Sequence, residues 1–157
     1  MSKKQFGLLL VVASLTLVLS ACGGSAKPVT LSDIPVYAGA QEFKPGESKI
    51  GDTLANNMKQ NAALTKAIGT GGQLEQKGFS LPSDGTWDAV SKFYDDKLKA
   101  AGWNTDSTTA SVLAVVNQSN DAFQTATYLR GNQSLSVIRM TDPISKAAFM
   151  FLSLNTR

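Results

Sequence analysis

The chemistry open to this chain is limited by the nucleophiles and bases that it contains. The sequence has a single cysteine, Cys22, and no histidine. Without histidine, Ser-His-Asp and Cys-His catalytic sites and histidine metal sites are excluded. With only one thiol in the chain, thiolate metal clusters are excluded as well. The sulfur of Cys22 is therefore the most conspicuous reactive atom, and the residues before it indicate its reaction.

Cys22 comes at the end of a segment with the features of an export signal. Lys3 and Lys4 form a basic start, residues 6–21 are mainly apolar, and small residues precede the cysteine. The apolar run is shorter than the roughly 20 residues that a helix needs to cross a bilayer core. A retained membrane-spanning anchor is therefore the less favoured alternative.

The tetrapeptide Leu19-Ser20-Ala21-Cys22 resembles the bacterial lipobox. The resemblance implies acylation of the Cys22 thiol with a diacylglyceryl group, palmitate being a typical fatty acid, and cleavage between Ala21 and Cys22. Two or more acyl chains hold a soluble domain stably on a membrane. We therefore expect an exported protein that is lipid-anchored to a bacterial membrane on its extracytoplasmic side, with the bilayer as its partner through Cys22.

The same resemblance divides the chain into three parts. Residues 1–21 are expected to be a lipoprotein signal peptide, residues 22–28 a lipidated flexible tether, and residues 29–157 a single folded domain. The tether is composed of small and polar residues, which cannot bury enough surface to become ordered. The length of the remaining chain suits one domain with its own core.

Charge excludes another class of function. The whole chain has 15 basic and 12 acidic residues, and removal of the signal takes away Lys3 and Lys4. The 13 basic residues that remain are nearly balanced by the 12 acidic ones. The lysines are dispersed, whereas nucleic-acid binding needs a clustered basic face. We therefore expect no nucleic-acid partner.

Serine precedes lysine at three places, and this pattern raises the possibility of hydrolysis. The pairs are Ser48-Lys49, Ser91-Lys92 and Ser145-Lys146, and a lysine can act as the base for a serine nucleophile. Neighbours in sequence do not by themselves converge on one substrate atom. A serine hydrolase is therefore the least favoured of three functional hypotheses.

Two other patterns have structural explanations. Asp95 and Asp96 are adjacent, but consecutive helix residues point about 100° apart, so we expect a solvated face on which Asp95 pairs with Lys99 and Asp88 pairs with Lys92. The glycines of residues 69–72 lack the Gly-Lys-Ser/Thr ending of a phosphate-binding loop and predict a turn. We expect no catalytic, cofactor-binding or metal-binding residues.

Periodicity predicts two amphipathic helices. Apolar residues recur at helical spacing over residues 50–68 and again over residues 86–101. In the second helix Thr86 is a suitable N-cap and Gly102 can take the left-handed position after the last turn. Trp103 is then expected to open a returning strand and to cover this helix.

The rest of the domain is predicted to be mostly strand. A strand is expected at residues 74–81, a hairpin at 123–130 and 134–141 around Gly131-Asn132, and a last strand at 147–154. Residues 29–40 are expected to be an extended edge segment and residues 41–49 a loop. Residues 106–120 fit either a strand or a short buried helix, and the valines favour a strand. The predicted fold is α+β: one antiparallel sheet of about four to six strands, with two amphipathic helices packed on one face.

Two segments resemble a pattern found in small exported bacterial lipoproteins of unassigned function. The first is Ile34-Pro35-Val36-Tyr37-Ala38-Gly39-Ala40, with Ala38 where that pattern usually has proline. The second is Phe93-Tyr94, then Leu98 and Gly102-Trp103. The resemblance implies no catalytic residues. We interpret the shared positions, together with Trp87, as structural anchors of the core: Tyr37, Trp87, Phe93, Leu98, Gly102 and Trp103.

Three functional hypotheses follow. The leading one is a non-catalytic accessory or protein-interaction domain of the cell envelope, which contacts another envelope protein through a sheet face or edge. The alternative is a small-molecule or cell-wall-binding module, whose pocket the aromatic side chains could line unless they fill the core: Tyr37, Trp87, Tyr94, Trp103 and Tyr128. The serine hydrolase is the third.

Overall fold

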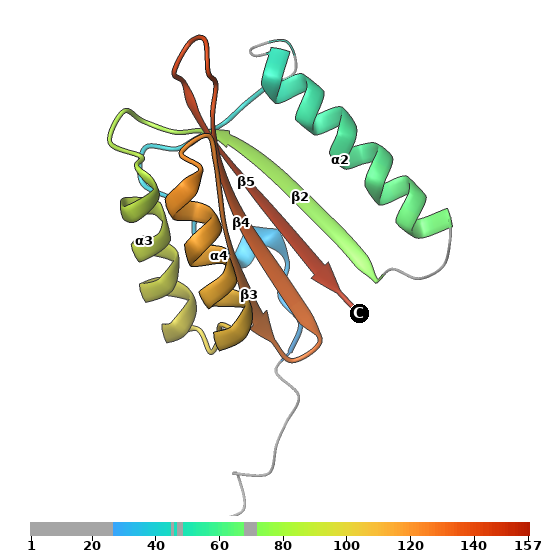
Figure 1. The fold of residues 1–157 in the computed structure, drawn as a ribbon. Coiled ribbons are helices and arrows are strands. Elements are labelled where there is room, and N and C mark those ends of the chain that lie inside the picture. The colour runs from blue at the N-terminus through green and yellow to red at the C-terminus, as the bar shows by residue number, and fades with distance from the viewer. Residues whose placement is uncertain (1–26, 45, 47–48, 68–71) are drawn as a thin grey trace, which may run out of the picture.

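The computed structural model describes residues 27–44, 46, 49–67 and 72–157. The predicted signal peptide, Cys22, most of the predicted tether and the glycines at 69 and 71 lie outside the described residues. Within the described part, the strands form one antiparallel sheet in the order β1-β2-β5-β4-β3 (Figure 1). Its strands are β1 (Gln41–Glu42), β2 (Gln73–Ser80), β3 (Phe123–Arg130), β4 (Gln133–Thr141) and β5 (Ala148–Thr156). The helices are the short 3₁₀ helix η1 (Leu31–Asp33), α2 (Lys49–Ala67), α3 (Trp87–Ala100) and α4 (Ser107–Ser119). The predicted α+β class with a single antiparallel sheet is confirmed.

Helix α3 packs on one face of the sheet and forms the core with it. Val90, Tyr94 and Leu98 of α3 are fully buried against side chains of β4 and β5. On the strands, Leu135 lies opposite Leu154, and Val137 lies opposite Leu152. Because side chains alternate along a strand, these residues share the face that α3 covers.

The boundaries of α3 follow the local signals. The Thr86 hydroxyl accepts a hydrogen bond from the amide of Ala89, and Gly102 has a φ of 81°, in the left-handed region. Trp103 is buried, as predicted, but it does not open a strand. The next residue, Asn104, makes only an isolated bridge to Leu129 at the end of β3.

Helix α2 lies on the opposite face of the sheet, which corrects the prediction that both helices share one face. On β5, Phe149 and Phe151 alternate with the core residues and point away from α3. Both meet the ring of Phe43 edge to face, at centroid distances of 6.0 and 5.6 Å. Ala55 of α2 lines a small cavity with Phe43 and Phe151. Because β5 carries apolar residues for both faces, its pattern does not alternate, and the sequence alone did not reveal the second face.

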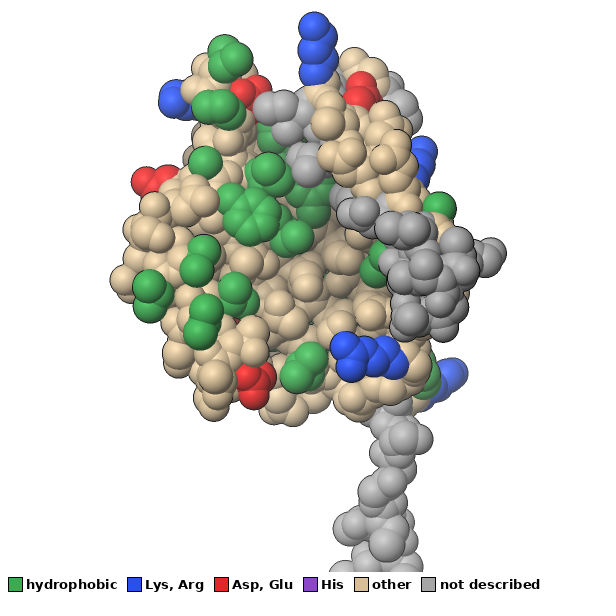
Figure 2. Space-filling model, turned by 45° about the vertical axis from the view of Figure 1, so that its right-hand side comes forward, with side chains coloured by type: hydrophobic (Ala, Val, Ile, Leu, Met, Phe, Trp, Pro, Cys, Tyr) green, Lys and Arg blue, Asp and Glu red, His purple; other side chains and the backbone are tan. Residues whose placement is uncertain are grey.

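Only part of this second face is covered. Figure 2 shows hydrophobic side chains gathered on it beside α2. Phe123 and Leu129 of β3, which point to this side, are exposed, and Ile138 and Met140 of β4 are half-buried. No helix in the described part of the chain is long and apolar enough to span a membrane.

Residues 107–119 form a helix, α4, where the valines favoured a strand. The Asp106 carboxylate accepts a hydrogen bond of 2.8 Å from the amide of Thr109 and so caps the first turn. Val112 and Val115, the residues that favoured a strand, are 60% and 69% exposed. Their β-branched side chains are therefore not packed in the sheet, and the cap and the contacts of the inner side of α4 decide its conformation.

The first described residues do not form an edge strand, contrary to the prediction for residues 29–40. Thr30 and Asp33 form a capping box around η1. Gln133, at the start of β4, bonds both backbone groups of Val29 through its side chain, at 2.9 and 2.7 Å. The chain is thus tied to the sheet by a side chain. The edge strand beside β2 is β1, in the segment predicted to be a loop.

The predicted hairpin is confirmed. β3 and β4 are joined by Gly131 and Asn132, and Gly131 has a φ of 57°. Such a two-residue turn with a positive φ matches the twist of the two strands. The hairpin makes β3 the outer strand of the sheet, and the edge of β3 becomes part of the candidate site.

Candidate binding cavity between helices α3 and α4

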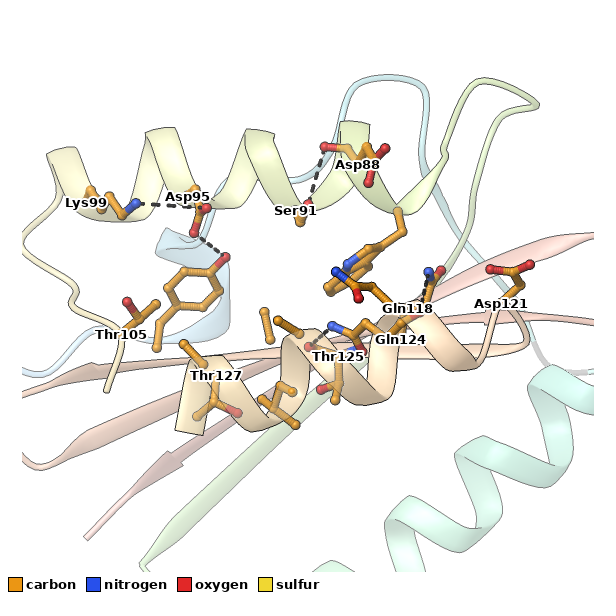
Figure 3. A pocket seen from close by; sticks show the side chains of 17 residues that line it. Asp88, Ser91, Asp95, Lys99, Thr105, Gln118, Asp121, Gln124, Thr125 and Thr127 are labelled. Carbon is orange, nitrogen blue, oxygen red and sulfur yellow. Dashed lines mark hydrogen bonds and ion pairs between the residues drawn. The ribbon is translucent and has the colours of Figure 1, made fainter. Parts of the chain in front are cut away.

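A cavity of about 490 Å³ lies between α3 and α4, over the edge of β3 (Figure 3). Its volume is in the range usual for small-ligand sites. Along α3, four polar residues at helical spacing line the cavity: Asp88, Ser91, Asp95 and Lys99. The cavity therefore collects polar groups from two helices and a strand.

The outer edge of β3 is hydrogen-bonded at two residues, Thr125 and Leu129. The amide and carbonyl of Thr125 bond the side chain of Asn117 on α4, both at 2.8 Å. The amide and carbonyl of Leu129 bond the backbone of Asn104, at 2.7 and 2.9 Å. These two residues therefore point their backbone groups away from β4.

The backbone of Thr127 is left open between these two closures. Outward-facing backbone groups recur at every second residue of an antiparallel edge strand, so Thr127 also points its N–H and C=O away from β4. Within the described residues neither group has a hydrogen-bond partner, and Thr127 lines the cavity. The cavity thus exposes one donor and one acceptor of a sheet edge.

Helix α4 leaves room for the cavity because two of its inner residues, Ala110 and Ala114, are small. Ala110 and Ala114 line the cavity, with Leu113 between them and Asn117 one turn further. The spacing i, i+3, i+4, i+7 places these four residues on one side of a helix. Asn117 is 8% exposed, and its side chain anchors this side to β3.

A carboxylate of the α3 wall contacts a tyrosine hydroxyl that comes from β3. The Tyr128 hydroxyl donates a hydrogen bond of 3.0 Å to Asp95, and Lys99 lies 3.9 Å from the other oxygen of Asp95. Burial, and in second place the Asp95 charge, raises the pKa of Tyr128 above its usual value. Tyr128 therefore stays neutral and acts as the donor, and Asp95 is satisfied by two partners.

The first turn of α3 contributes a carboxylate without such partners. The predicted pair of Asp88 with Lys92 is absent, because Lys92 bonds Asp96 at 2.9 Å instead. In the described part of the chain Asp88 has no ion-pair partner. Trp87, its neighbour, is half-buried and lines the cavity. This end of the cavity therefore combines an aromatic ring with an unpaired negative charge.

A second cavity of about 440 Å³ adjoins this end and shares Trp87, Asp88, Asp121 and Gln124 with the first. It contains Arg139, held by three acceptors: the carbonyl of Gly85 at 2.8 Å, Gln124 Oε1 at 3.1 Å and Thr141 Oγ1 at 3.0 Å. Burial lowers the pKa of Arg139, and the charge of Asp121 opposes this shift. Arg139 lines the second cavity together with the carboxylates of Asp88 and Asp121.

The predicted anchors fall into two groups. Leu98 and Trp103 are buried in the core, and Gly102 ends α3. Tyr37 and Phe93 are half-buried and stack edge to face at 5.5 Å. The exception is Trp87, which belongs to the cavity wall.

Of the other aromatic residues considered for a pocket, Tyr94 is buried in the core, and Tyr128 is buried with its hydroxyl at the cavity wall. Sequence reasoning missed Asn117 and Thr127. The small-residue spacing on α4 could have indicated the cavity if a helix had been expected there.

The serine–lysine pairs do not meet in the described residues. Ser91 bonds the carbonyl of Asp88, and Ser145 bonds the carboxylate of Asp142. Lys92 is engaged by Asp96. Ser48 lies outside the described residues.

Acidic residues in the described part of the chain do not come together in a group of three that could hold a metal ion. Comparison of the chain with protein-family models, curated proteins and solved structures found no match. The geometry of the cavity therefore carries the argument about function.

Proposed function

We propose that this chain is a non-catalytic, lipid-anchored domain of the bacterial cell envelope that binds a small polar ligand in the cavity between α3 and α4. The observation that carries the proposal is a cavity of about 490 Å³ that is lined by the open backbone of Thr127, the carboxylate of Asp88 and the ring of Trp87. Sites for small ligands combine such a concavity with a few placed polar groups. Of the functions considered from the sequence, the small-molecule or cell-wall-binding module fits this geometry best.

The proposed anchor is Cys22, acylated on export and holding the domain on the extracytoplasmic side of the membrane. The stretch from Cys22 to Lys27, where the described chain begins, spans at most about 18 Å when extended. The ligand would thus be bound close to the membrane surface. Replacing Cys22 by serine should abolish fatty-acid labelling and release the domain from membranes. Continued labelling would show that Cys22 is not the acylated residue.

A protein partner is the second candidate, and the outer side of α4 favours it. Val112 and Val115 are largely exposed, and Val116 next to them is 40% exposed. Three neighbouring valines on one helix face form an apolar patch of the kind that contacts proteins. The patch lies on the other side of α4 from the cavity residues Ala110 and Ala114, so the two functions can be tested separately.

Equilibrium dialysis against a soluble envelope extract, read by mass spectrometry, tests the cavity. In Ala114→Phe the added ring fills the cavity from α4, and in the matched control Val115→Phe the same ring lies on the outer side. We expect compounds that are retained by the wild type and by Val115→Phe but lost in Ala114→Phe. Equal retention by all three proteins, or no retention by the wild type, would contradict the proposal.

A further inference from the structure

We infer that the ligand of this cavity is an ammonium-bearing amide, such as a residue of a short peptide with a basic side chain. The inference rests on the proposed function and specifies its ligand class. Two independent features carry it: the open backbone groups of Thr127 and the unpaired charge of Asp88.

The open backbone groups select an amide. The N–H and C=O of one edge residue bond a partner that offers an acceptor and a donor at the spacing of a peptide backbone. Two residues of the protein already bond the edge in this way. The backbone of Asn104 bonds Leu129, and the carboxamide of Asn117 bonds Thr125. Thr127 thus offers a ligand the same pair of backbone groups that the protein itself bonds at Thr125 and Leu129.

The same closures limit the length of the partner. Thr125 and Leu129 are four residues apart, which corresponds to about 14 Å of strand. Because both are occupied, a long peptide cannot add a strand along β3. One residue of the ligand can pair with Thr127, and its side chain or terminus then extends along the cavity.

The charge at the end near Trp87 selects a cation. Asp95 is engaged by Tyr128 and Lys99, whereas Asp88 and Asp121, which line the same cavity, have no ion-pair partner among the described residues. Asp88 and Trp87 both line this end of the cavity, and a carboxylate and an aromatic ring each attract an ammonium group. An anionic ligand would instead face the carboxylates of the cavity.

Three probes separate these contributions: Nα-acetyl-lysine methylamide, its norleucine analogue, which lacks the ammonium group, and butylamine, which lacks the amides. Binding is followed through tryptophan fluorescence of the full-length protein in detergent, and Trp87→Phe identifies the signal of the cavity. We expect the lysine probe to bind at least about tenfold more tightly than either of the others. Equal affinity of the lysine and norleucine probes would overturn the inference.

Two pairs of variants locate the contacts. Thr127→Pro removes the open N–H, whereas Thr127→Ala keeps it. Proline is tolerated on an edge strand where the N–H does not face the neighbouring strand. Asp88→Asn removes the charge in the cavity, and Asp84→Asn removes an exposed charge just before the same helix, at a residue that lines neither cavity. Thr127→Pro and Asp88→Asn should each weaken the lysine probe about tenfold or more, with the matched variants unchanged.

The outcomes distinguish this inference from the proposed function. If a neutral disaccharide changes the Trp87 fluorescence and the lysine probe does not, the ligand class is wrong and the cavity remains the binding site. If Ala114→Phe leaves the compounds retained in dialysis unchanged, the proposed function itself fails. Unchanged affinity in Thr127→Pro, with circular dichroism showing a folded protein, would refute the role of the open backbone groups.

Discussion

Helices α3 and α4 form the two walls of the cavity, and they are attached to the sheet in different ways. α3 buries an apolar stripe, with Leu98 only 1% exposed, and every local signal for a helix coincides with that stripe. α4 exposes its valines and buries a polar residue, Asn117, which bonds the strand edge. Apolar burial stabilises in proportion to area, whereas a hydrogen bond adds little net free energy but fixes position. The comparison indicates that α3 supports the fold and that α4 covers the edge and shapes the cavity.

The largest expected effect is on α3. Leu98→Ala removes a buried side chain from the core and should lower the free energy of unfolding by about 2–5 kcal/mol. The matched truncation on α4, Val115→Ala, should change it by less than about 0.5 kcal/mol because Val115 is exposed. Urea unfolding followed by circular dichroism measures both. Similar losses in the two variants would remove the distinction between the helices.

A smaller effect is expected where α4 bonds the edge. Asn117→Ala leaves the amide and carbonyl of Thr125 without a partner and should cost about 1–3 kcal/mol. Asn117→Asp keeps the acceptor for the Thr125 amide but places a buried, charged acceptor against the Thr125 carbonyl, so its effect should be at least as large as that of Asn117→Ala. The control is Gln118→Ala, on the same helix, which should be close to neutral. If Asn117→Ala is also neutral in urea unfolding, the side chain does not fix α4.

The smallest effect concerns pH. The Asp106 carboxylate accepts hydrogen bonds from Thr109, from the backbone amide first and then from the side-chain hydroxyl, and these lower the pKa of Asp106 below the usual aspartate value. Because the pKa of Asp106 is lower in the folded than in the unfolded protein, its capping bonds stabilise the fold fully above the unfolded pKa of about 4. This stabilisation is lost as the pH falls through the folded pKa. The first turn of α4 should therefore loosen in acid, and the NMR shift of the Thr109 amide reports it. Asp106→Asn, which caps without titrating in this range, should remove the pH dependence of that shift.

The sequence predicted α3 and the hairpin because their signals are local. Thr86, Gly102 and the Gly131-Asn132 turn each act on residues within a few positions, so their effect can be inferred without a fold. The pair of Asp95 with Lys99 was predicted for the same reason and is present.

The cavity depends on contacts between segments that are distant in the sequence, and the sequence alone did not reveal these contacts. Asp95 was expected on a solvated face, but β3 brings Tyr128 to it across 33 positions of the chain. Residues 107–119 were expected to be a strand because valine favours strands. In the fold those valines face outward, and the role of Asn117 becomes visible only when β3 lies beside it. Likewise, the second face of β2 and β5 is buried only where Phe43 and helix α2 lie over it.

The two hydrogen bonds between the Gln133 side chain and the backbone of Val29 have a mechanical consequence. Together with the bond from Arg130 to the carbonyl of Lys27, they tie the start of the described chain to the turn between β3 and β4. With the anchor proposed at Cys22, any pull on the tether enters the domain at this hairpin. The load then passes into the β4 ladder, which is bonded along its length to β3 and β5. The proposed point of attachment and the strand that lines the cavity thus belong to one hydrogen-bonded unit, so a force between membrane and domain would act first beside the candidate cavity.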